Sequence, residues 1–224
     1  MSVKPIFFAL DGKNLSEFSK ELAILKGHIF GVKVGLEMFT SEGPSSVEKL
    51  KQEGWKVFLD LKLHDIPNTV KAATESAGNI GADFLTIHIA SGNEALDAAQ
   101  EVKSNSMKIL GVSSALTSKA FTSTTSDEVL NDFLKAKESN IDGVICPPSE
   151  ISKSKKLFDL IVTPGIRLKN DTNDDQKNIT TPEKAIESGA DYLVMGRSIR
   201  NNIEYVVENL TLRASLSQHH LETI

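Results

Sequence analysis

The stretch VFLDLKLHDIPN (57–68) puts charged residues where a buried strand normally has none. Its first three residues, Val-Phe-Leu, are typical of a buried β-strand. Asp60, Lys62 and Asp65 follow at once with the spacing D-x-K-x-x-D, ahead of a proline that marks a turn or the start of a helix. In barrels of parallel strands, catalytic groups lie at the carboxyl ends of the strands. The stretch therefore predicts a strand that carries functional side chains at its C-terminal end.

Short apolar runs of this kind recur along the chain. The expected strands cover residues 6–10, 29–35, 56–62, 84–90, 108–114, 142–147, 160–166 and 192–196. Segments of helical composition lie between them, at 15–27, 45–54, 68–82, 94–103, 126–140 and 181–190, with a last helix at 198–216. Several of the runs are continuously apolar, as parallel strands covered by helices are. Eight strands alternating with helices predict an α/β fold, a (β/α)8 TIM barrel.

An open doubly wound sheet is the alternative fold. Such sheets commonly carry a G-x-G-x-x-G phosphate-binding sequence after the first strand. Here the first strand continues into ALDGKN (9–14), which lacks that pattern. No linker or low-complexity stretch divides the 224 residues, so we expect a single domain over residues 1–224.

The composition is typical of a soluble globular protein, with 40% hydrophobic and 25% charged residues. A net charge of −5 argues against a nucleic-acid or membrane partner, because both require a basic surface. No apolar run is long enough for the core of a signal peptide or for a membrane span. Cys146 is the only cysteine, which fits a reducing compartment. We therefore expect a cytoplasmic protein.

Lys33 joins the charged residues on geometric grounds. Residues two apart on a strand share a face, so Asp60 and Lys62 are expected to point the same way. Lys33 ends the preceding strand between two valines and faces away from them. If it shares the Asp60 face, then Lys33, Asp60, Lys62 and Asp65 form an array of alternating charge. The alternative is a set of ion pairs that only plugs the barrel, but burying four charges for stability alone is unfavourable.

An anion site is expected at the ends of the last two strands, where barrel enzymes often bind phosphate. The motifs VTPGIR and VMGRSI end these strands and contribute Arg167, Gly196 and Arg197. Glycine permits close backbone approach to a ligand, and arginine adds a charged contact. The polar stretch 168–178 is a candidate lid or, alternatively, an ordinary surface loop.

Metal and thiol chemistry are not indicated. The five histidines show no ligand spacing on one expected face. Cys146 ends an expected strand, where a buried cysteine is more often an inert packing residue than a reactive one.

Together these motifs resemble the orotidine 5′-phosphate decarboxylase family over essentially the full length of the chain. The matching motifs are ALD (9–11), VKVG (32–35), FLDLKLHDIPNTV (58–70), ALTS (115–118), VTPGIR (162–167), DDQ (174–176) and MGRSI (195–199). The second and third are specific in combination. The resemblance implies a (β/α)8 barrel that converts orotidine 5′-phosphate to UMP without a cofactor or metal. It also implies a homodimer with active sites at the dimer interface.

The resemblance also assigns roles to individual residues. Lys62 matches the family's proton donor, and Asp60 matches the carboxylate placed beside that of the substrate. Lys33 completes the charged network, and Asp65 matches the aspartate that reaches into the neighbouring subunit's site. Asp60 and Lys33 also count among the substrate-binding positions. The remaining substrate-binding positions are Asp11 at the ribose, Thr69, Thr117 near the pyrimidine, and Arg167, Gln176, Gly196 and Arg197 at the phosphate.

One position departs from the family pattern. The family commonly has a histidine immediately before Ala-x-Gly, whereas Ile89 separates His88 from that motif here. We therefore assign His88 no role in the site.

The expected mechanism is electrostatic. Loss of CO2 from C6 of orotidine 5′-phosphate leaves a carbanion in the ring plane, with no conjugated sink and no cofactor to supply one. The ammonium of Lys62 can stabilise that charge and then protonate C6. Asp60 and Asp65 would keep Lys62 protonated and fixed, and Lys33 would balance them. Asp60 can also repel the carboxylate of the substrate.

Three other functions stay open on the sequence alone. The 3-keto-gulonate 6-phosphate decarboxylase and hexulose-phosphate synthase type shares the barrel and D-x-K-x-x-D, but uses Mg²⁺ and has a carboxylate in place of Lys33. An aldolase that forms a Schiff base through Lys62 is less favoured, because neighbouring carboxylates keep the amine protonated. A non-catalytic nucleotide-binding protein would keep the pocket and release no CO2.

Overall fold

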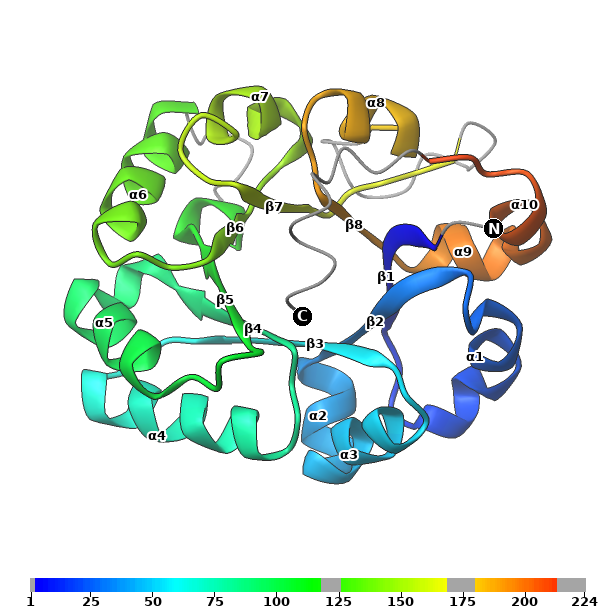
Figure 1. Cartoon of the computed structure of the whole chain (residues 1–224), viewed down its shortest axis with the longest axis horizontal. Helices are drawn as coiled ribbons and strands as arrows, with labels where there is room; N and C mark the ends of the chain where they lie inside the picture. The colour runs from blue at the N-terminus through cyan, green and yellow to red at the C-terminus, as the bar shows by residue number, and fades with distance from the viewer. Residues whose placement is uncertain (1–2, 118–125, 169–179, 213–224) are drawn as a thin grey trace.

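A closed barrel of eight parallel strands forms the centre of the computed structural model (Figure 1). The structure describes residues 3–117, 126–168 and 180–212. The strands are β1 (Lys4–Leu10), β2 (Ile29–Gly35), β3 (Lys56–Leu63), β4 (Phe84–His88), β5 (Lys108–Val112), β6 (Gly143–Ile145), β7 (Leu160–Thr163) and β8 (Tyr192–Met195). Each strand pairs with its neighbours in sequence, and β8 pairs with β1 to close the barrel. The predicted (β/α)8 TIM barrel is confirmed, and the alternative of an open sheet is wrong.

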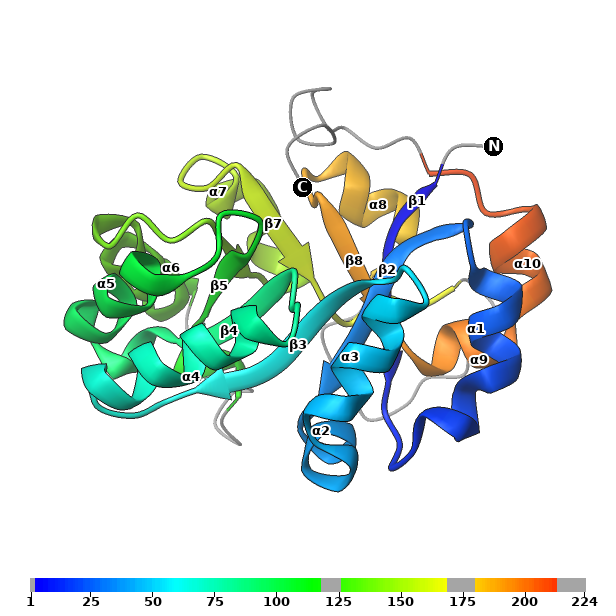
Figure 2. The same cartoon turned by 60° about the horizontal axis from the view of Figure 1, so that its bottom comes forward.

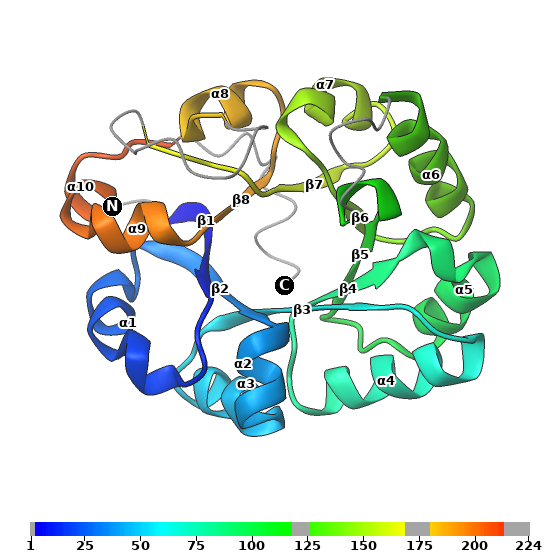
Figure 3. The ribbon, with the colours of Figure 1, turned by 180° about the vertical axis from the view of Figure 1, so that it is seen from behind.

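Helices surround the barrel, as views from its two ends show (Figure 1, Figure 3). The helices are α1 (Ser19–Leu25), α2 (Leu36–Glu42), α3 (Pro44–Gln52), α4 (Pro67–Asn79), α5 (Asn93–Val102), α6 (Ser126–Glu138), α7 (Ile151–Ser154), α8 (Pro182–Glu187), α9 (Arg197–Asn201) and α10 (Ile203–Glu208). Short 3-10 helices are η1 (Leu15–Phe18), η2 (Ile89–Ser91), η3 (Ser114–Leu116) and η5 (Pro148–Glu150). Because helices cover the outer face of the strands and side chains fill the inner face, most strand residues are buried, which explains the continuous apolar runs.

The helices differ from the prediction in three places. α2 and α7 are not predicted by the sequence pattern, because seven and four residues are too few to show an apolar period. Gly43, with φ 63°, separates α2 from α3. The expected single helix at 198–216 is wrong, since the helix breaks at Asn202 and its second part ends at Glu208. The Asn202 side chain donates to Ser198 O at 3.1 Å, and it thereby engages the carbonyl that a continuing helix would use.

Aromatic rings fill the N-terminal half of the barrel lumen. Phe7 contacts Phe58 and Phe84 with ring centroids 5.4 and 5.0 Å apart. Tyr192 lies 4.5 Å from Phe30 and 5.4 Å from Phe7. These five rings, which we call the aromatic floor, belong to a lumen cluster that is distinct from the larger core between strands and helices. Close-packed rings exclude water from beneath the C-terminal strand ends.

Three aspartates tie neighbouring strands together at the N-terminal end of the barrel. Asp83 accepts a backbone N–H from β3 at 2.7 Å, Asp142 accepts one from β5 at 2.8 Å, and Asp191 accepts one from β7 at 2.7 Å. Each carboxylate also binds lysine ammonium groups. The first and last of these aspartates lie in the related sequences GADFL (81–85) and GADYL (189–193), which lead into β4 and β8. The same local device therefore recurs four strands apart.

Among the described residues, no helix is long and apolar enough to cross a membrane. The views from different sides show one barrel with its helices packed outside the strands (Figure 2). The organisation of residues 1–224 as one domain and the cytoplasmic localisation stay predictions.

We predict that Asp83→Ala lowers the free energy of unfolding by about 3 kcal/mol. The substitution leaves the buried N–H of Val57 without its acceptor. It also separates Lys51 and Lys56 from the carboxylate that they contact at 2.5 and 3.3 Å. Urea unfolding followed by circular dichroism measures the loss.

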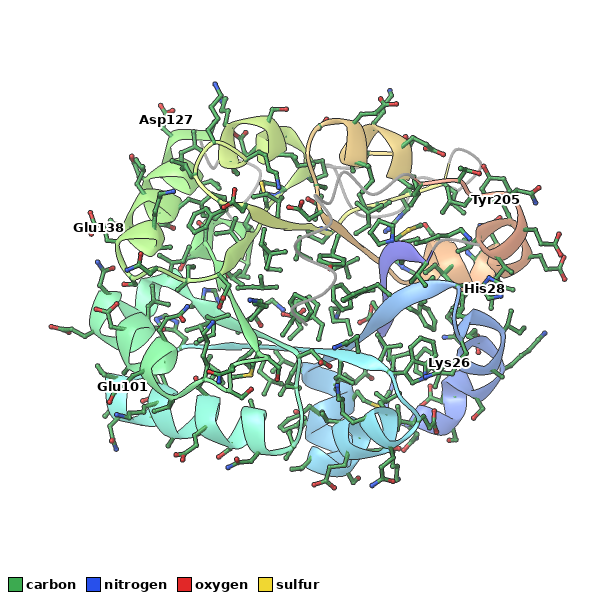
Figure 4. The ribbon with its side chains drawn as sticks, in the orientation of Figure 1. Lys26, His28, Glu101, Asp127, Glu138 and Tyr205 are labelled. Carbon is green, nitrogen blue, oxygen red and sulfur yellow. The ribbon has the colours of Figure 1, made fainter. Side chains whose placement is uncertain are left out.

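Glu101→Ala is the matched control for this substitution. Glu101 lies at the outer edge of the ring of helices (Figure 4) and pairs with Lys71 at 2.9 Å, with 69% of the Glu101 side chain exposed. An exposed pair of this kind contributes less than about 1 kcal/mol. Equal losses in the two variants would show that the buried aspartate contributes no more than a surface ion pair.

Candidate active site

Four charged side chains form a continuous chain at the C-terminal mouth of the barrel. Lys33 Nζ lies 3.4 Å from Asp11 Oδ1 and 3.5 Å from Asp60 Oδ2. Lys62 Nζ lies 2.8 Å from Asp60 Oδ1. We call Asp11, Lys33, Asp60 and Lys62 the charged chain, in which the signs alternate from β1 to β3. The structure thus brings together three of the residues that the spacing grouped, and it adds Asp11 as an ion-pair partner of Lys33.

Strand geometry points Asp60 and Lys33 into the lumen. Asp60 lies two residues after Phe58, a member of the aromatic floor, and residues two apart on a strand share a face. Lys33 lies two residues after Gly31, which also faces the lumen, because a Cβ on Gly31 would lie 3.0 Å from the ring of Phe7. Both charged side chains therefore face the lumen.

Lys62 departs from regular strand geometry. Its φ is 52°, a left-handed conformation that is uncommon for residues other than glycine. The pairing of β3 with β4 shifts register between Leu59 and Leu63, around this residue. The Lys62 N–H donates to Thr86 Oγ1 at 2.9 Å, and the same hydroxyl donates to Asp60 Oδ1 at 2.9 Å. No pattern in the sequence marks Thr86 as a site residue, because a threonine inside an apolar strand is an ordinary β-former.

Asp60 stays ionised although only 13% of its side chain is exposed. Burial alone would raise the pKa of Asp60. The ammonium groups of Lys33 and Lys62, with hydrogen bonds from Lys62 and Thr86, outweigh burial and lower the pKa of Asp60 below its usual value. The carboxylate is therefore a fixed negative charge that holds two cations in place.

The charged chain lines a cavity of about 200 Å³ at the barrel mouth. The other lining residues come from the end of β1, from β2 and from the start of α2, and are Leu10, Gly35, Leu36, Glu37 and Met38. A larger cavity of about 500 Å³ lies on the outside of the barrel between α1 and α3, and its lining contains none of the predicted site residues. We take the mouth cavity as the candidate active site, because its wall carries the buried charges.

The strands opposite the charged chain present an apolar wall to the lumen. Val112 of β5, Ile145 of β6, Val162 of β7 and Val194 of β8 pack in the lumen cluster. The lumen is therefore apolar on the side of β5 to β8 and charged on the side of β2 and β3.

Asp65 and Thr69 lie outside the charged chain in one copy of the protein. Asp65 is exposed, and its Oδ1 accepts the N–H of Ile66 at 2.7 Å. Thr69 is exposed in the first turn of α4. Two large apolar side chains are also exposed. Ile66, which follows Asp65 in the sequence, is 66% exposed, and Leu36, which lines the mouth cavity, is 56% exposed. The role of Asp65 across a dimer interface stays a prediction.

Thr117 follows a short 3-10 helix at the end of β5. Ser113 is fully buried there, and its Oγ donates to Asp132 Oδ2 at 2.7 Å while it accepts the N–H of Ala115 at 3.3 Å. This contact caps η3 and ties it to α6. Thr117 itself is exposed and donates from Oγ1 to Ser114 O at 3.3 Å. Its contact with a pyrimidine stays a prediction.

The strand ends that are expected to bind phosphate lie side by side. Ser198 Oγ donates to Ile166 O at 3.4 Å, which links the start of α9 to the residue before Arg167. Gly196 packs against the end of β1, where a Cβ would lie 3.3 Å from Asp11 Oδ2. These positions therefore adjoin the charged chain.

Part of the expected phosphate site falls outside the described residues. Gln176 lies there, as does the candidate lid 168–178 apart from Leu168. The backbone that flanks this segment is tied together, because the Arg167 N–H donates to Thr180 O at 3.0 Å. Arg197 is exposed at the start of α9. Phosphate binding by these residues stays a prediction.

His88 and His64 form a pair of rings 5.2 Å apart. Burial, with the nearby His64 and Lys62, lowers the pKa of His88 below its usual value. His88 is therefore neutral at neutral pH and adds no charge to the site. Its Nδ1 is buried and has no hydrogen-bond partner among the described residues. That part of the chain also contains no group of three or more His, Cys, Asp or Glu arranged to hold a metal ion.

Known proteins resemble this chain in both sequence and fold. The family model described as orotidine 5′-phosphate decarboxylase / HUMPS matches residues 4–208. Orotidine 5′-phosphate decarboxylases from Listeria monocytogenes and Oenococcus oeni are 40% and 41% identical over 214 and 208 residues. Each alignment covers 88% of this chain and 91% of the relative.

Solved structures of proteins with the same name resemble this chain in fold. The crystal structure of orotidine 5′-phosphate decarboxylase from Lactobacillus acidophilus superposes with a TM-score of 0.74 at 31% identity, covering 91% of this chain and 97% of that one. The enzyme of the same name from Pyrococcus horikoshii is 24% identical with a TM-score of 0.73, and it supports the fold alone. The chain therefore belongs to the orotidine 5′-phosphate decarboxylase / HUMPS family.

Proposed function

We propose that this protein decarboxylates orotidine 5′-phosphate to UMP and carbon dioxide, as a carboxy-lyase of pyrimidine biosynthesis. The observation that carries the proposal is the carboxylate of Asp60, held between the ammonium groups of Lys33 and Lys62 at 3.5 and 2.8 Å. The reaction requires a fixed cation beside the carbon that loses CO2, and this arrangement supplies one. The relatives named above are decarboxylases of the same substrate.

Lys62 is the residue that we assign to the reacting carbon. Its side chain is 30% exposed and lines the cavity, whereas the Lys33 side chain is 11% exposed. Cleavage of the bond between C6 and the carboxylate leaves an electron pair on C6 in the plane of the ring. The Lys62 ammonium stabilises that pair as it develops and then transfers a proton to C6. Lys33 would act on the other oxygen of Asp60 and keep the carboxylate in place.

Asp60 contributes in two ways. It binds and orients the Lys62 ammonium, and it places a negative charge beside the carboxylate of the substrate. Two like charges about 4 Å apart at an effective dielectric of about 20 repel each other by roughly 4 kcal/mol. Departure of CO2 removes this repulsion, and the Lys62 ammonium then faces the remaining negative charge.

The rest of the nucleotide would be bound away from the bond that breaks. The pyrimidine would occupy the mouth cavity beside Lys62, with Thr117 near its edge. Asp11, with 68% of its side chain exposed, is accessible to a ribose hydroxyl. Phosphate binding is assigned to Arg167, Gln176, Gly196 and Arg197. Binding energy from these remote contacts would hold C6 against Lys62.

We infer that the active unit is a homodimer whose two sites each receive Asp65 from the partner subunit. Asp65 is exposed, and within the described residues it forms no ion pair with Lys62 of its own chain. The exposed Ile66 beside it and Leu36 at the cavity supply apolar surface for such an interface. A partner's Asp65 would add a second carboxylate to Lys62 and continue the alternation of charge.

A magnesium-dependent lyase on hexulose phosphates is the alternative within the same family. That chemistry needs a carboxylate where this chain has Lys33, and a buried ammonium at this place repels a divalent cation. The Lys33 ammonium and the named relatives both favour decarboxylation of orotidine 5′-phosphate. We therefore place this alternative second.

We predict that Lys62→Ala reduces turnover of orotidine 5′-phosphate by at least about 10⁴-fold, because both charge stabilisation and proton transfer are lost. Binding of UMP should change by less than about threefold, since the phosphate contacts are remote from Lys62. Loss of substrate absorbance measures turnover, and calorimetry measures binding. Lys71→Ala, on the outer helices, is the control and should keep full activity. Residual decarboxylation above a few per cent would contradict the assignment.

We predict that inactive Lys62→Ala and Asp65→Ala proteins regain activity when they are mixed and exchange subunits. Half of the dimers are then hybrids with one intact site each, so activity should reach about a quarter of the wild-type value. A mixture of Lys62→Ala with Asp60→Ala is the control, because these two residues serve the site of the same chain. That mixture should stay inactive. Failure of the first mixture to regain activity, with subunit exchange verified, would exclude a shared site.

We predict that the purified protein consumes orotidine 5′-phosphate at an unchanged rate after exhaustive treatment with EDTA. Addition of Mg²⁺ should not raise the rate, because no step in the proposed mechanism uses a metal. A parallel assay with 3-keto-gulonate 6-phosphate should show no reaction. Activity that disappears with EDTA and returns with Mg²⁺ would favour the magnesium-dependent alternative, and UMP binding without CO2 release would favour a non-catalytic protein.

A further inference from the structure

Thr86 lies at the junction of the two catalytic side chains, on the strand next to theirs. It belongs to β4, is fully buried and contacts both Asp60 and Lys62 of β3. Phe58 and Phe84 are paired across β3 and β4, and Asp60 and Thr86 each follow their phenylalanine by two residues, so both side chains face the lumen. Thr86 is therefore an uncharged residue whose hydroxyl contacts the charged chain.

The directions of both hydrogen bonds are fixed by chemistry. A backbone N–H can only donate, so Thr86 Oγ1 accepts from Lys62 at 2.9 Å. An ionised carboxylate can only accept, so the Thr86 proton goes to Asp60 Oδ1 at 2.9 Å. One hydroxyl therefore joins the backbone of Lys62 to the carboxylate that binds its ammonium. These contacts form a closed ring of hydrogen bonds, since Lys62 Nζ donates to the same Oδ1 at 2.8 Å.

The backbone of Lys62 needs this support. A left-handed φ of 52° costs a non-glycine residue free energy, and it persists only where the surroundings stabilise it. The register shift between β3 and β4 occurs at this point in the ladder. Thr86 gives the Lys62 N–H an acceptor on β4 where the regular pairing is interrupted.

We propose that Thr86 is a positioning residue of this site, whose hydroxyl holds Lys62 in its left-handed conformation and sets the Asp60 oxygen that orients the Lys62 ammonium. The inference rests on the proposed function for its catalytic consequence, and on the contacts above for its geometry. A valine at this position would fill nearly the same volume and keep the strand. The hydroxyl alone is therefore the group to remove.

Thr86→Val should lower kcat by about 10- to 100-fold, because a displacement of the reacting group by about 1 Å is enough for such a loss. The KM for orotidine 5′-phosphate and the Kd for UMP should change by less than about threefold, since the nucleotide contacts are intact. Thr86→Ser restores the hydroxyl and should return kcat to within about threefold of wild type. This separation of kcat from binding would not arise from general loosening of the barrel.

Thr74→Val is the matched control. Thr74 is also fully buried, but its hydroxyl donates to Val70 O at 2.8 Å within α4, away from the charged chain. Its removal should leave kcat unchanged. If Thr86→Val does not fold by circular dichroism, Thr86→Ala with Thr74→Ala as its control serves the same comparison, because alanine removes the hydroxyl without adding bulk.

Unchanged kcat in Thr86→Val would overturn the inference, and so would a parallel loss of UMP binding or a failure of serine to restore kcat. Crystal structures of wild type and Thr86→Val give a readout independent of turnover. In the variant, Lys62 should leave the left-handed region and its Nζ should move away from Asp60 Oδ1. Lys62 unmoved in the variant overturns the inference, whatever the substrate. A wild-type protein that leaves orotidine 5′-phosphate intact, with Lys62 displaced in the variant, overturns the proposed function and upholds the positioning role.

Discussion

A carboxylate that is nearly withdrawn from water yet remains ionised is the constraint on which this molecule depends. Two ammonium groups and one hydroxyl stabilise the ionised carboxylate of Asp60, and each contacts one particular oxygen. None of these partners is optional, because an unpaired buried charge costs several kcal/mol. The strand register, the left-handed turn at Lys62 and the placement of β4 can all be understood as the geometry that brings the three partners to one residue.

Carboxylates have different roles at the two ends of the barrel: those at the N-terminal end stabilise the fold, and those at the C-terminal end belong to the candidate active site. At the N-terminal end, the carboxylates of Asp83, Asp142 and Asp191 satisfy backbone N–H groups, and their ion pairs lock adjacent strands. At the C-terminal end, carboxylates of the same type bind side chains that line a cavity. The carboxylates at the two ends differ in the groups that donate hydrogen bonds to them. Asp83, Asp142 and Asp191 accept backbone N–H groups and stabilise the fold, whereas Asp60 holds two ammonium groups beside the cavity and sets up the reaction.

The sequence predicted most of the fold because continuous apolar runs report strands that are buried on both faces. Its errors fall where helices are short or broken, as at α2 and Asn202, since local hydrogen bonds decide these and periodicity does not. At the site, the spacing of Asp60 and Lys62 was enough to group them, because strand geometry is regular at Asp60. Thr86 could not be found in this way, since its role follows from a φ angle and a register shift that no residue pattern displays.

The aromatic floor gives the barrel the form of a cup and not of a tube. Within the described residues, Phe7, Phe84 and Tyr192 pack across the lumen and close it beneath the charged chain. We expect the substrate and both products to pass through the mouth cavity. Carbon dioxide set free beside Lys62 would start at the inner end of that cavity with the nucleotide in front of it. Carbon dioxide would then leave either past the bound nucleotide or after UMP departs, so the packing at the closed end of the barrel constrains the order of product release.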